Sequence, residues 1–179
     1  NNDIKFDDLD KVLSHPTDLR IFAIAQALEE GYSIDRIEEL TKIDKWFLER
    51  LDNIVKYKKV LSGYNSIEEL PKDVLKEAKR LGFSDFQIAR FVESPSGNME
   101  QEVLKVRNHR KALDVVPHVR RINTVASEYP DLTNYLYVTY GADENSIPYD
   151  MNAGNNIVVL GSGAYRIGSS VEFDWCSVN

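Results

Sequence analysis

The apolar positions of the first 114 residues recur at helical spacing, in short segments that polar caps and glycines separate. Thr17 opens one such segment and Gly31 ends it. A threonine oxygen accepts from a free backbone N–H at a helix start, and glycine adopts the left-handed conformation that closes a helix. Ser33 opens a second segment, and Asp44 opens a longer one that runs to about Leu61. The pattern therefore predicts three successive helices.

Two capping boxes continue this pattern. Ser66 with Glu69, and Ser84 with Gln87, place a hydroxyl three residues before a carboxylate or an amide. At this spacing the two side chains satisfy each other's backbone donors. Gly82 closes the helix that is predicted between the two boxes.

One more helix ends this part of the chain. Residues 93–98 predict a loop because they contain Pro95 and Gly97. Residues 99 to about 113 are again helical in pattern, and Pro117 follows. We therefore expect a mainly α fold up to this point.

Beyond residue 119 the composition changes. Residues 119–140 are rich in Thr, Asn, Val and Tyr, and residues 134–140 alternate weakly, which predicts a strand or an extended segment. A polar linker at 141–155 leads to the β-branched run 157–160, which is typical of a buried parallel strand. A glycine-rich turn and the start of a helix follow. Because a parallel strand needs partners elsewhere, we expect the chain to be a piece of a larger protein.

Composition limits the function classes. Hydrophobic residues make up 42% of the 179 residues and charged residues 28%, which is a globular profile. The net charge of −7 argues against general nucleic-acid binding, since surfaces that neutralise phosphates carry the opposite bias. No stretch approaches the roughly 18 apolar residues that cross a bilayer. Cys176 is the single cysteine and the three histidines lie far apart, so we expect no metal site.

The glycine-rich turn allows two interpretations. Gly161, Gly163, Arg166 and Gly168 lie between the predicted strand and helix, where backbone N–H groups and the helix dipole favour an anion. The glycine spacing differs from the dinucleotide fingerprint, and the lysine of a Walker loop is missing. The turn is either a phosphate or carboxylate site, which the Arg166 guanidinium suits, or only a tight connection.

Residues 80–92 also allow two interpretations. With Gly82 in the turn and Ser84 capping a second helix, they resemble a helix-turn-helix, which would make the protein a DNA-binding regulator. The alternative is a helical hairpin that packs apolar side chains into a core. We favour the hairpin, because Arg90 is the only cation of the second helix. Its expected core residues are Phe83, Phe86, Ile88, Phe91 and Val92.

A basic cluster occupies the last predicted helix. It consists of Lys105, Arg107, Arg110 and Lys111, with His109. We expect its side chains either to face solvent or to form ion pairs with an acidic neighbouring segment.

Six segments, in this order, resemble the large subunit of carbamoyl-phosphate synthase. They are residues 16–22, 41–48, 81–85, 121–128, 133–140 and 159–176. The last, Val-Leu-Gly-Ser-Gly-Ala-Tyr-Arg-Ile-Gly-Ser-Ser-Val-Glu-Phe-Asp-Trp-Cys, is the most specific. The resemblance covers nearly the whole chain, from about Phe6 onward.

The resemblance implies an order of domains. Residues 1–140 would be the helical oligomerization domain, 141–155 a linker, and 156–179 the truncated start of an α/β pre-ATP-grasp domain. In this family the helical domain separates two synthetase halves, each with an ATP-grasp unit. Neither unit lies in these 179 residues, so we expect a scaffold without a cofactor, inactive alone.

The resemblance also implies the activity of the full-length enzyme. It is an ATP-dependent carbon–nitrogen ligase that makes carbamoyl phosphate from bicarbonate, ammonia released from glutamine, and two ATP, for arginine and pyrimidine biosynthesis. It would use ATP with Mg or Mn and a monovalent cation. Its expected partners are a glutaminase small subunit, the two synthetase halves of its own chain and further copies of itself, in the cytoplasm.

Under this resemblance Gly161, Gly163, Arg166 and Gly168 lie at the entrance to the second synthetase domain, where Arg166 would pair with carbamate or its phosphorylated product. Exposed apolar faces around 46–47 or 86–91 would be buried against another chain or domain. The polar segment from 124 to 140 would contact the synthetase halves, since buried polar groups need hydrogen-bond partners. The expected interface residues are Trp46, Phe47, Phe86, Phe91, Thr124, Glu128, Asn134 and Tyr137.

Overall fold

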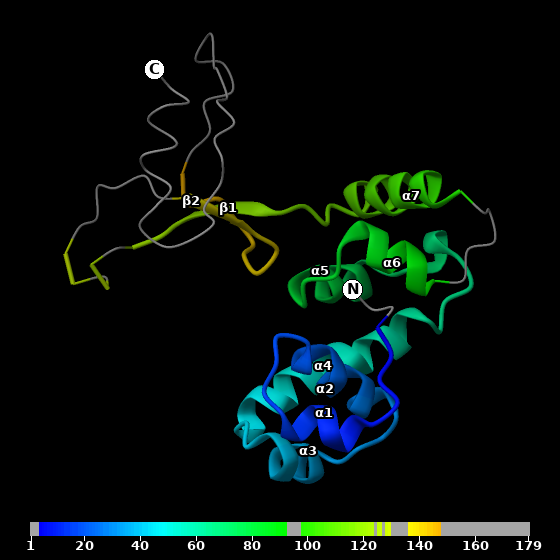
Figure 1. Ribbon diagram of the computed structural model, residues 1–179. Helices are drawn as coiled ribbons and strands as arrows, with labels where there is room; N and C mark the ends of the chain where they lie inside the picture. Colours follow the sequence, from blue (N-terminus) through cyan, green and yellow to red (C-terminus); the bar gives the residue numbers. More distant parts are fainter. Residues whose placement is uncertain (1–3, 93–97, 124, 127, 130–135, 148–179) are drawn as a thin grey trace, which may run out of the picture. The chain divides into compact units, whose positions relative to one another are not determined.

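The computed structural model describes residues 4–92, 98–123, 125, 126, 128, 129 and 136–147 (Figure 1). These residues form α1 (Leu9–Ser14), α2 (Arg20–Glu29), α3 (Ile34–Thr41), α4 (Lys45–Leu61), the short 3₁₀ helix η1 (Ile67–Glu69), α5 (Lys72–Arg80), α6 (Asp85–Phe91), α7 (Met99–Ala112), β1 (His118–Arg121) and β2 (Leu136–Thr139). All of these elements lie in the first of the two units into which the chain divides, Asn1–Asn145. The expected mainly α class is confirmed for this part. The strand, turn and helix start expected from residue 156 onward lie outside the described residues.

Three helices begin at the polar residues that the sequence predicts. The Ser33 hydroxyl accepts a hydrogen bond from Arg36 N at 3.1 Å. The Asp44 carboxylate accepts one from Trp46 N at 2.8 Å. At Ser84 the full capping box forms: the hydroxyl accepts from Gln87 N at 3.1 Å, and Gln87 Oε1 accepts from Ser84 N at 2.9 Å. Local side-chain chemistry therefore sets the starts of α3, α4 and α6.

Gly31 and Gly82 end α2 and α5 as predicted. Both have φ of +93°, in the left-handed region that disfavours an L side chain. In each case the N–H of the next residue returns to the carbonyl five residues before it, for Tyr32 at 2.9 Å and for Phe83 at 3.0 Å. This is the Schellman arrangement, which satisfies carbonyls at the end of a helix.

Two predicted helix starts are wrong. Helix α2 begins at Arg20, and Thr17 only accepts Arg20 N with its backbone carbonyl at 3.2 Å, in a turn before the helix. Ser66 makes no side-chain cap, and η1 is a single 3₁₀ turn. The reason is Pro71, because a proline disfavours helical backbone in the residue before it, and Leu70 is extended. Helix α5 therefore starts only after this proline.

Two elements were not predicted. Helix α1 is capped by Asp8, whose carboxylate accepts from Lys11 N at 3.0 Å, and it buries Leu9 and Leu13. Strand β1 pairs antiparallel with β2, with Val119 opposite Val138. The strand alternative for the segment before residue 140 is confirmed at Leu136–Thr139.

The buried apolar side chains form two clusters. The N-terminal core lies among α1, α2, α3 and the first part of α4, which Figure 1 shows gathered together. It contains Leu9, Leu13, Ala23, Ile24, Ala27, Leu28, Ile37, Leu48 and Val55. The C-terminal core lies among the end of α4, η1, α5, α6 and α7, and it contains Leu61, Ile67, Leu70, Leu75, Ala78, Phe83, Ile88, Ala89, Val92, Val106 and Val115.

Helix α4 belongs to both cores. Leu48 and Val55 lie in the N-terminal core, and Leu61 lies in the C-terminal core. Tyr57 ties the helix to α5, because its hydroxyl donates to the Val74 carbonyl at 2.9 Å. Burial raises the pKa of Tyr57 to about 12. One continuous helix thus connects the two packed groups of helices.

Candidate functional site

Part of the site that the sequence predicts lies outside the described residues. This holds for the glycine-rich turn at 161–168, with its four candidate anion-binding residues, and for Thr124 and Asn134. Glu128 and Tyr137 are described and exposed, Tyr137 on β2. The roles of all these residues stay predictions. The described part offers surfaces and a partly buried cluster of charges.

An aromatic pair marks the first turn of α4. Trp46 and Phe47 are 54% and 58% exposed, although both are large apolar side chains. Their rings meet edge to face at 5.0 Å between centroids, and the Arg50 guanidinium lies 4.8 Å from the Trp46 ring. This cation–π contact holds the indole against the helix. The pair is thus a fixed apolar surface.

Phe47 also borders a groove between α2 and α4, which we name the α2/α4 groove. The groove has a volume of about 490 Å³. Its lining residues are Thr17, Asp18, Arg20, Ile21, Ile24, Ile43, Phe47, Arg50 and Leu51. Ile21, at 52% exposed, extends the apolar surface onto α2. Exposed apolar patches rimmed by charged residues are typical of protein–protein contacts.

The second candidate face, at Phe86 and Phe91, is smaller than expected. Phe86 on α6 is 48% exposed, so its prediction as a core residue is wrong. Phe91 is partly buried and packs edge to face on Phe83, with ring centroids 5.9 Å apart. Phe86 alone therefore presents an apolar surface here.

The interpretation of residues 80–92 as a segment that packs apolar side chains into a core is confirmed except at Phe86. Phe83, Ile88 and Val92 lie in the C-terminal core. The start of α6, which a helix-turn-helix would present to DNA, carries the Asp85 carboxylate, which is largely taken up by contacts within the chain. No observation on the described residues supports a DNA-recognition helix.

Asp85 binds two cations at the point where three helices meet. Lys79 Nζ lies 2.9 Å from Asp85 Oδ1, and Arg110 Nε lies 3.0 Å from both carboxylate oxygens of Asp85. The Lys79, Asp85 and Arg110 side chains are only 8%, 15% and 12% exposed. Arg110 also donates to the Val115 carbonyl at 3.2 Å. One carboxylate thereby joins the end of α5, the start of α6 and the end of α7.

The ring of Tyr140 covers this ion group. Tyr140 directly follows β2, and its ring centroid lies 5.0 Å from Lys79 Nζ and 5.7 Å from Arg110 Cζ. Two cations share one carboxylate, and the negative face of an aromatic ring attracts the excess positive charge. Burial raises the pKa of the Tyr140 hydroxyl. We name Lys79, Asp85, Arg110 and Tyr140 the Asp85 cluster.

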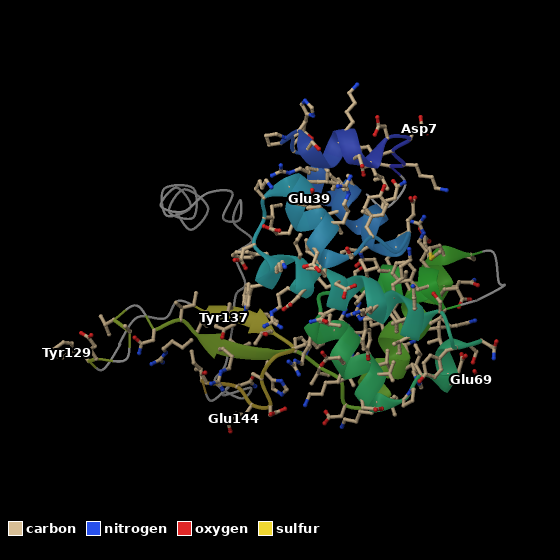
Figure 2. The ribbon with its side chains drawn as sticks, turned by 90° about the horizontal axis from the view of Figure 1, so that it is seen from below. Asp7, Glu39, Glu69, Tyr129, Tyr137 and Glu144 are labelled. Atoms are coloured by element: carbon tan, nitrogen blue, oxygen red, sulfur yellow. The ribbon has the colours of Figure 1, made fainter. Side chains whose placement is uncertain are left out.

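The loop after Tyr140 is held by three further contacts. Asp143 accepts from Lys76 Nζ of α5 at 2.7 Å, which also lowers the pKa of that carboxyl. Asn145 Oδ1 accepts from Val119 N at 2.8 Å. The Glu144 carbonyl accepts from Arg120 at 3.3 Å, and Figure 2 shows Glu144 on this loop. The loop thus contacts both α5 and β1.

Three of the basic residues of α7 make contacts within the chain, while Arg107 and Lys111 are exposed, so each of the two interpretations holds for part of the cluster. Lys105 pairs with Glu102 at 2.9 Å, and Arg110 with Asp85. His109 Nε2 lies 2.9 Å from the Leu70 carbonyl. Ion pairs and hydrogen bonds within the chain account for these three side chains.

Sequence reasoning missed the Asp85 cluster, although it considered Arg110 as part of a basic cluster. Asp85 and Arg110 stand 25 positions apart, and Tyr140 stands 30 positions after Arg110. A signal was present at Asp85, because a carboxylate at the start of a short helix between two basic segments suits ion pairing. The contacts themselves depend on how α5, α6 and α7 pack.

Within the described ranges, no group of three or more His, Cys, Asp or Glu side chains is arranged to hold a metal ion. No helix in this part of the chain is long and apolar enough to cross a membrane.

Two family models match the chain in succession. Residues 1–114 match the carbamoyl-phosphate synthetase large chain oligomerisation domain. Residues 153–179 match the carbamoyl phosphate synthase preATP-grasp domain. The described hairpin and its following loop therefore lie between the two matched stretches.

Curated relatives align over almost all of the chain. The multifunctional protein URA2 of Saccharomyces cerevisiae is 49% identical over 172 residues, which are 96% of this chain and 7% of the relative. The mitochondrial arginine-specific carbamoyl phosphate synthase large chain of Schizosaccharomyces pombe is 50% identical over 175 residues, 97% of this chain and 14% of the relative. That of Neurospora crassa is 49% identical over 176 residues, 98% of this chain and 14% of the relative. The chain thus spans only about a tenth of the length of these proteins. The chain belongs to the family of the carbamoyl-phosphate synthetase large chain oligomerisation domain.

Proposed function

We propose that these residues are the part of a carbamoyl-phosphate synthase large chain that joins its helical domain to its second synthetase half. The observation that carries the proposal is the succession of the two matches, first the oligomerisation domain and then the preATP-grasp domain. Two packed cores that share α4 support a mechanical role, since a rigid helical body can hold its neighbours at a constant spacing.

In this proposal the full-length chain makes carbamoyl phosphate. One ATP activates bicarbonate, ammonia displaces the phosphate to give carbamate, and a second ATP phosphorylates the carbamate. A glutaminase partner supplies the ammonia, and ATP acts with Mg or Mn and a monovalent cation. The product serves arginine or pyrimidine biosynthesis, in the cytoplasm, although two of the relatives described above carry the word mitochondrial in their names.

A scaffold matters for this chemistry because carbamate is unstable in water. Two synthetase halves held in register can pass carbamate inside the protein, which avoids its release. In the proposal the segment around Glu128 and Tyr137 contacts the synthetase halves. Both side chains are exposed in the described part of the chain, and Tyr137 offers an aromatic ring with a hydroxyl donor.

The isolated chain is expected to be inactive. Purified residues 1–179, incubated with ATP, Mg²⁺, bicarbonate and ammonia, are expected to form no carbamoyl phosphate above the protein-free background. The full-length chain under the same conditions is expected to form it. Product is measured by conversion to citrulline with added ornithine carbamoyltransferase. Synthesis by the isolated chain would contradict the scaffold role, and none by the full-length chain would contradict the proposed reaction.

The α2/α4 groove and the neighbouring aromatic pair are proposed as the self-association surface: Phe47 lines the groove, and the Trp46 ring contacts Phe47. Replacing both by serine in the full-length chain is expected to weaken association by at least about 30-fold, since each buried aromatic anchor contributes about 2 kcal/mol to an interface. Sedimentation velocity over a concentration series measures the change. Leu104→Ser is the control, because Leu104 on α7 is equally exposed, at 54%, but lies outside the groove. Equal sedimentation of the double serine variant, the Leu104→Ser control and the unsubstituted chain would contradict this proposal.

A further inference from the structure

The strand that leads out of the hairpin is poorly anchored by its own side chains. Leu136, Tyr137 and Val138 of β2 are 44%, 46% and 67% exposed. A two-stranded hairpin is marginally stable in water at best. Contacts of the residues on either side of the hairpin with the helices therefore help to hold it: Val115, before β1, lies in the C-terminal core, and the residues after β2 contact the helices as well.

Tyr140 supplies such a contact directly after β2. It is partly buried, and it packs against the C-terminal core as well as against Lys79 and Arg110. Its ring therefore combines apolar burial with attraction to two cations that a carboxylate already orients. Tyr140, which lies outside the helices, thus contacts the two cations of α5 and α7.

The Lys76–Asp143 ion pair is a second contact, but a weaker one. Both side chains are largely exposed, so solvent screens the pair and holding it ordered costs side-chain entropy. The pair therefore contributes little to holding the loop. It offers a matched control for Tyr140 from the same loop.

We propose that Tyr140, seated on the ion group of Lys79, Asp85 and Arg110, is the joint that fixes where the chain leaves the helical domain toward the residues that match the preATP-grasp domain. Tyr140 is then a positioning residue: it touches no substrate, and it acts by keeping the second synthetase half in register with the first. This inference rests on the proposed function. It adds to that function a named set of side chains that sets the geometry.

The ring and the hydroxyl of Tyr140 can be separated by substitution. Tyr140→Phe retains the aromatic face and removes only the hydroxyl. Tyr140→Leu retains a large apolar side chain but has no negative face to meet the two cations. A joint that depends on the ring predicts that phenylalanine preserves it and leucine does not.

The test uses the full-length chain with ammonia as the nitrogen donor. Hydrogen exchange of peptides that cover 136–145, followed by mass spectrometry, is expected to be about tenfold faster in Tyr140→Leu, and within twofold of the unsubstituted chain in Tyr140→Phe and in Asp143→Asn. Peptides from α1 to α3 serve as the internal reference and are expected not to change. This pattern separates a local joint from general loss of stability.

The second readout is the number of ATP molecules consumed per carbamoyl phosphate formed. In Tyr140→Leu this ratio is expected to rise, because carbamate escapes between misaligned halves, while bicarbonate-dependent ATP hydrolysis stays within twofold. In Tyr140→Phe the ratio is expected to equal that of the unsubstituted chain. A merely structural role would lower both partial reactions together.

Three outcomes would overturn the inference. Unchanged hydrogen exchange at 136–145 in Tyr140→Leu would show that the Tyr140 ring does not hold this segment. Faster hydrogen exchange with an unchanged number of ATP molecules per carbamoyl phosphate would show that Tyr140 does not couple the two synthetase halves. Tyr140→Phe behaving like Tyr140→Leu would assign the effect to the hydroxyl instead. Absence of carbamoyl phosphate synthesis by the unsubstituted chain would remove the proposed function and the coupling role, while the exchange comparison would still decide whether the joint exists.

Discussion

Asp85→Asn is expected to lower the free energy of unfolding of the helical domain by about 3 kcal/mol, the scale measured when one partner of a buried ion pair is removed. The carboxylate faces Lys79 and Arg110, and neither cation is more than 12% exposed. An uncharged amide would leave both cations without a counter-charge at a site that little water reaches. Urea denaturation of residues 1–179, followed by helical circular dichroism, measures the change.

A surface pair gives the control for this substitution. Lys45 and Asp35 also form an ion pair between two helical segments, but both side chains are exposed. Asp35→Asn is therefore expected to cost less than about 1 kcal/mol. Equal losses for the two variants would show that burial of the Asp85 cluster contributes nothing to its strength.

Arg166→Ala in the full-length chain is expected to depress carbamate phosphorylation by about 100-fold, the scale of losing one charged donor to a reacting oxyanion. This prediction follows from the proposed pairing of the Arg166 guanidinium with carbamate or its phosphorylated product. The bicarbonate-dependent ATPase belongs to the other synthetase half in this proposal, so it is expected to change by less than about twofold. The reverse partial reaction, ATP formation from ADP and carbamoyl phosphate, measures the second half alone.

Arg166→Lys separates charge from geometry in this test. Lysine keeps the positive charge but loses the planar pair of donors that fits an oxyanion. We expect an intermediate loss in the second-half reaction. Equal losses of both partial reactions in Arg166→Ala would count against a role at the second site and favour a structural role for the turn.

The helix ends show how far local patterns reach. Ser33, Asp44 and Ser84 cap helices as predicted, because a cap satisfies backbone donors within three residues of itself. Ser66 has the same local signal with Glu69, yet it caps nothing, since Pro71 stops the helix that the pattern predicts. A proline five residues away therefore outweighed a correct capping spacing.

Phe86 and Phe91 show the limit for apolar residues. Both belong to the same predicted hairpin, but Phe86 is exposed and Phe91 packs on Phe83. Helical spacing places residues on faces, while the neighbouring helices decide which face is covered. The exposure expected at Trp46 and Phe47 is confirmed, and their interface role stays a prediction.

The amino-acid order by itself determined the helical class, the positions of most helix ends and the family, because each depends on residues close together or on an ordered set of short motifs. Tertiary structure alone decided that Lys79, Asp85, Arg110 and Tyr140 meet, and that the hairpin of β1 and β2 forms. Those contacts join residues far apart along the chain. Their formation requires that packing of apolar side chains offset the entropy of closing long loops, which no local pattern reports.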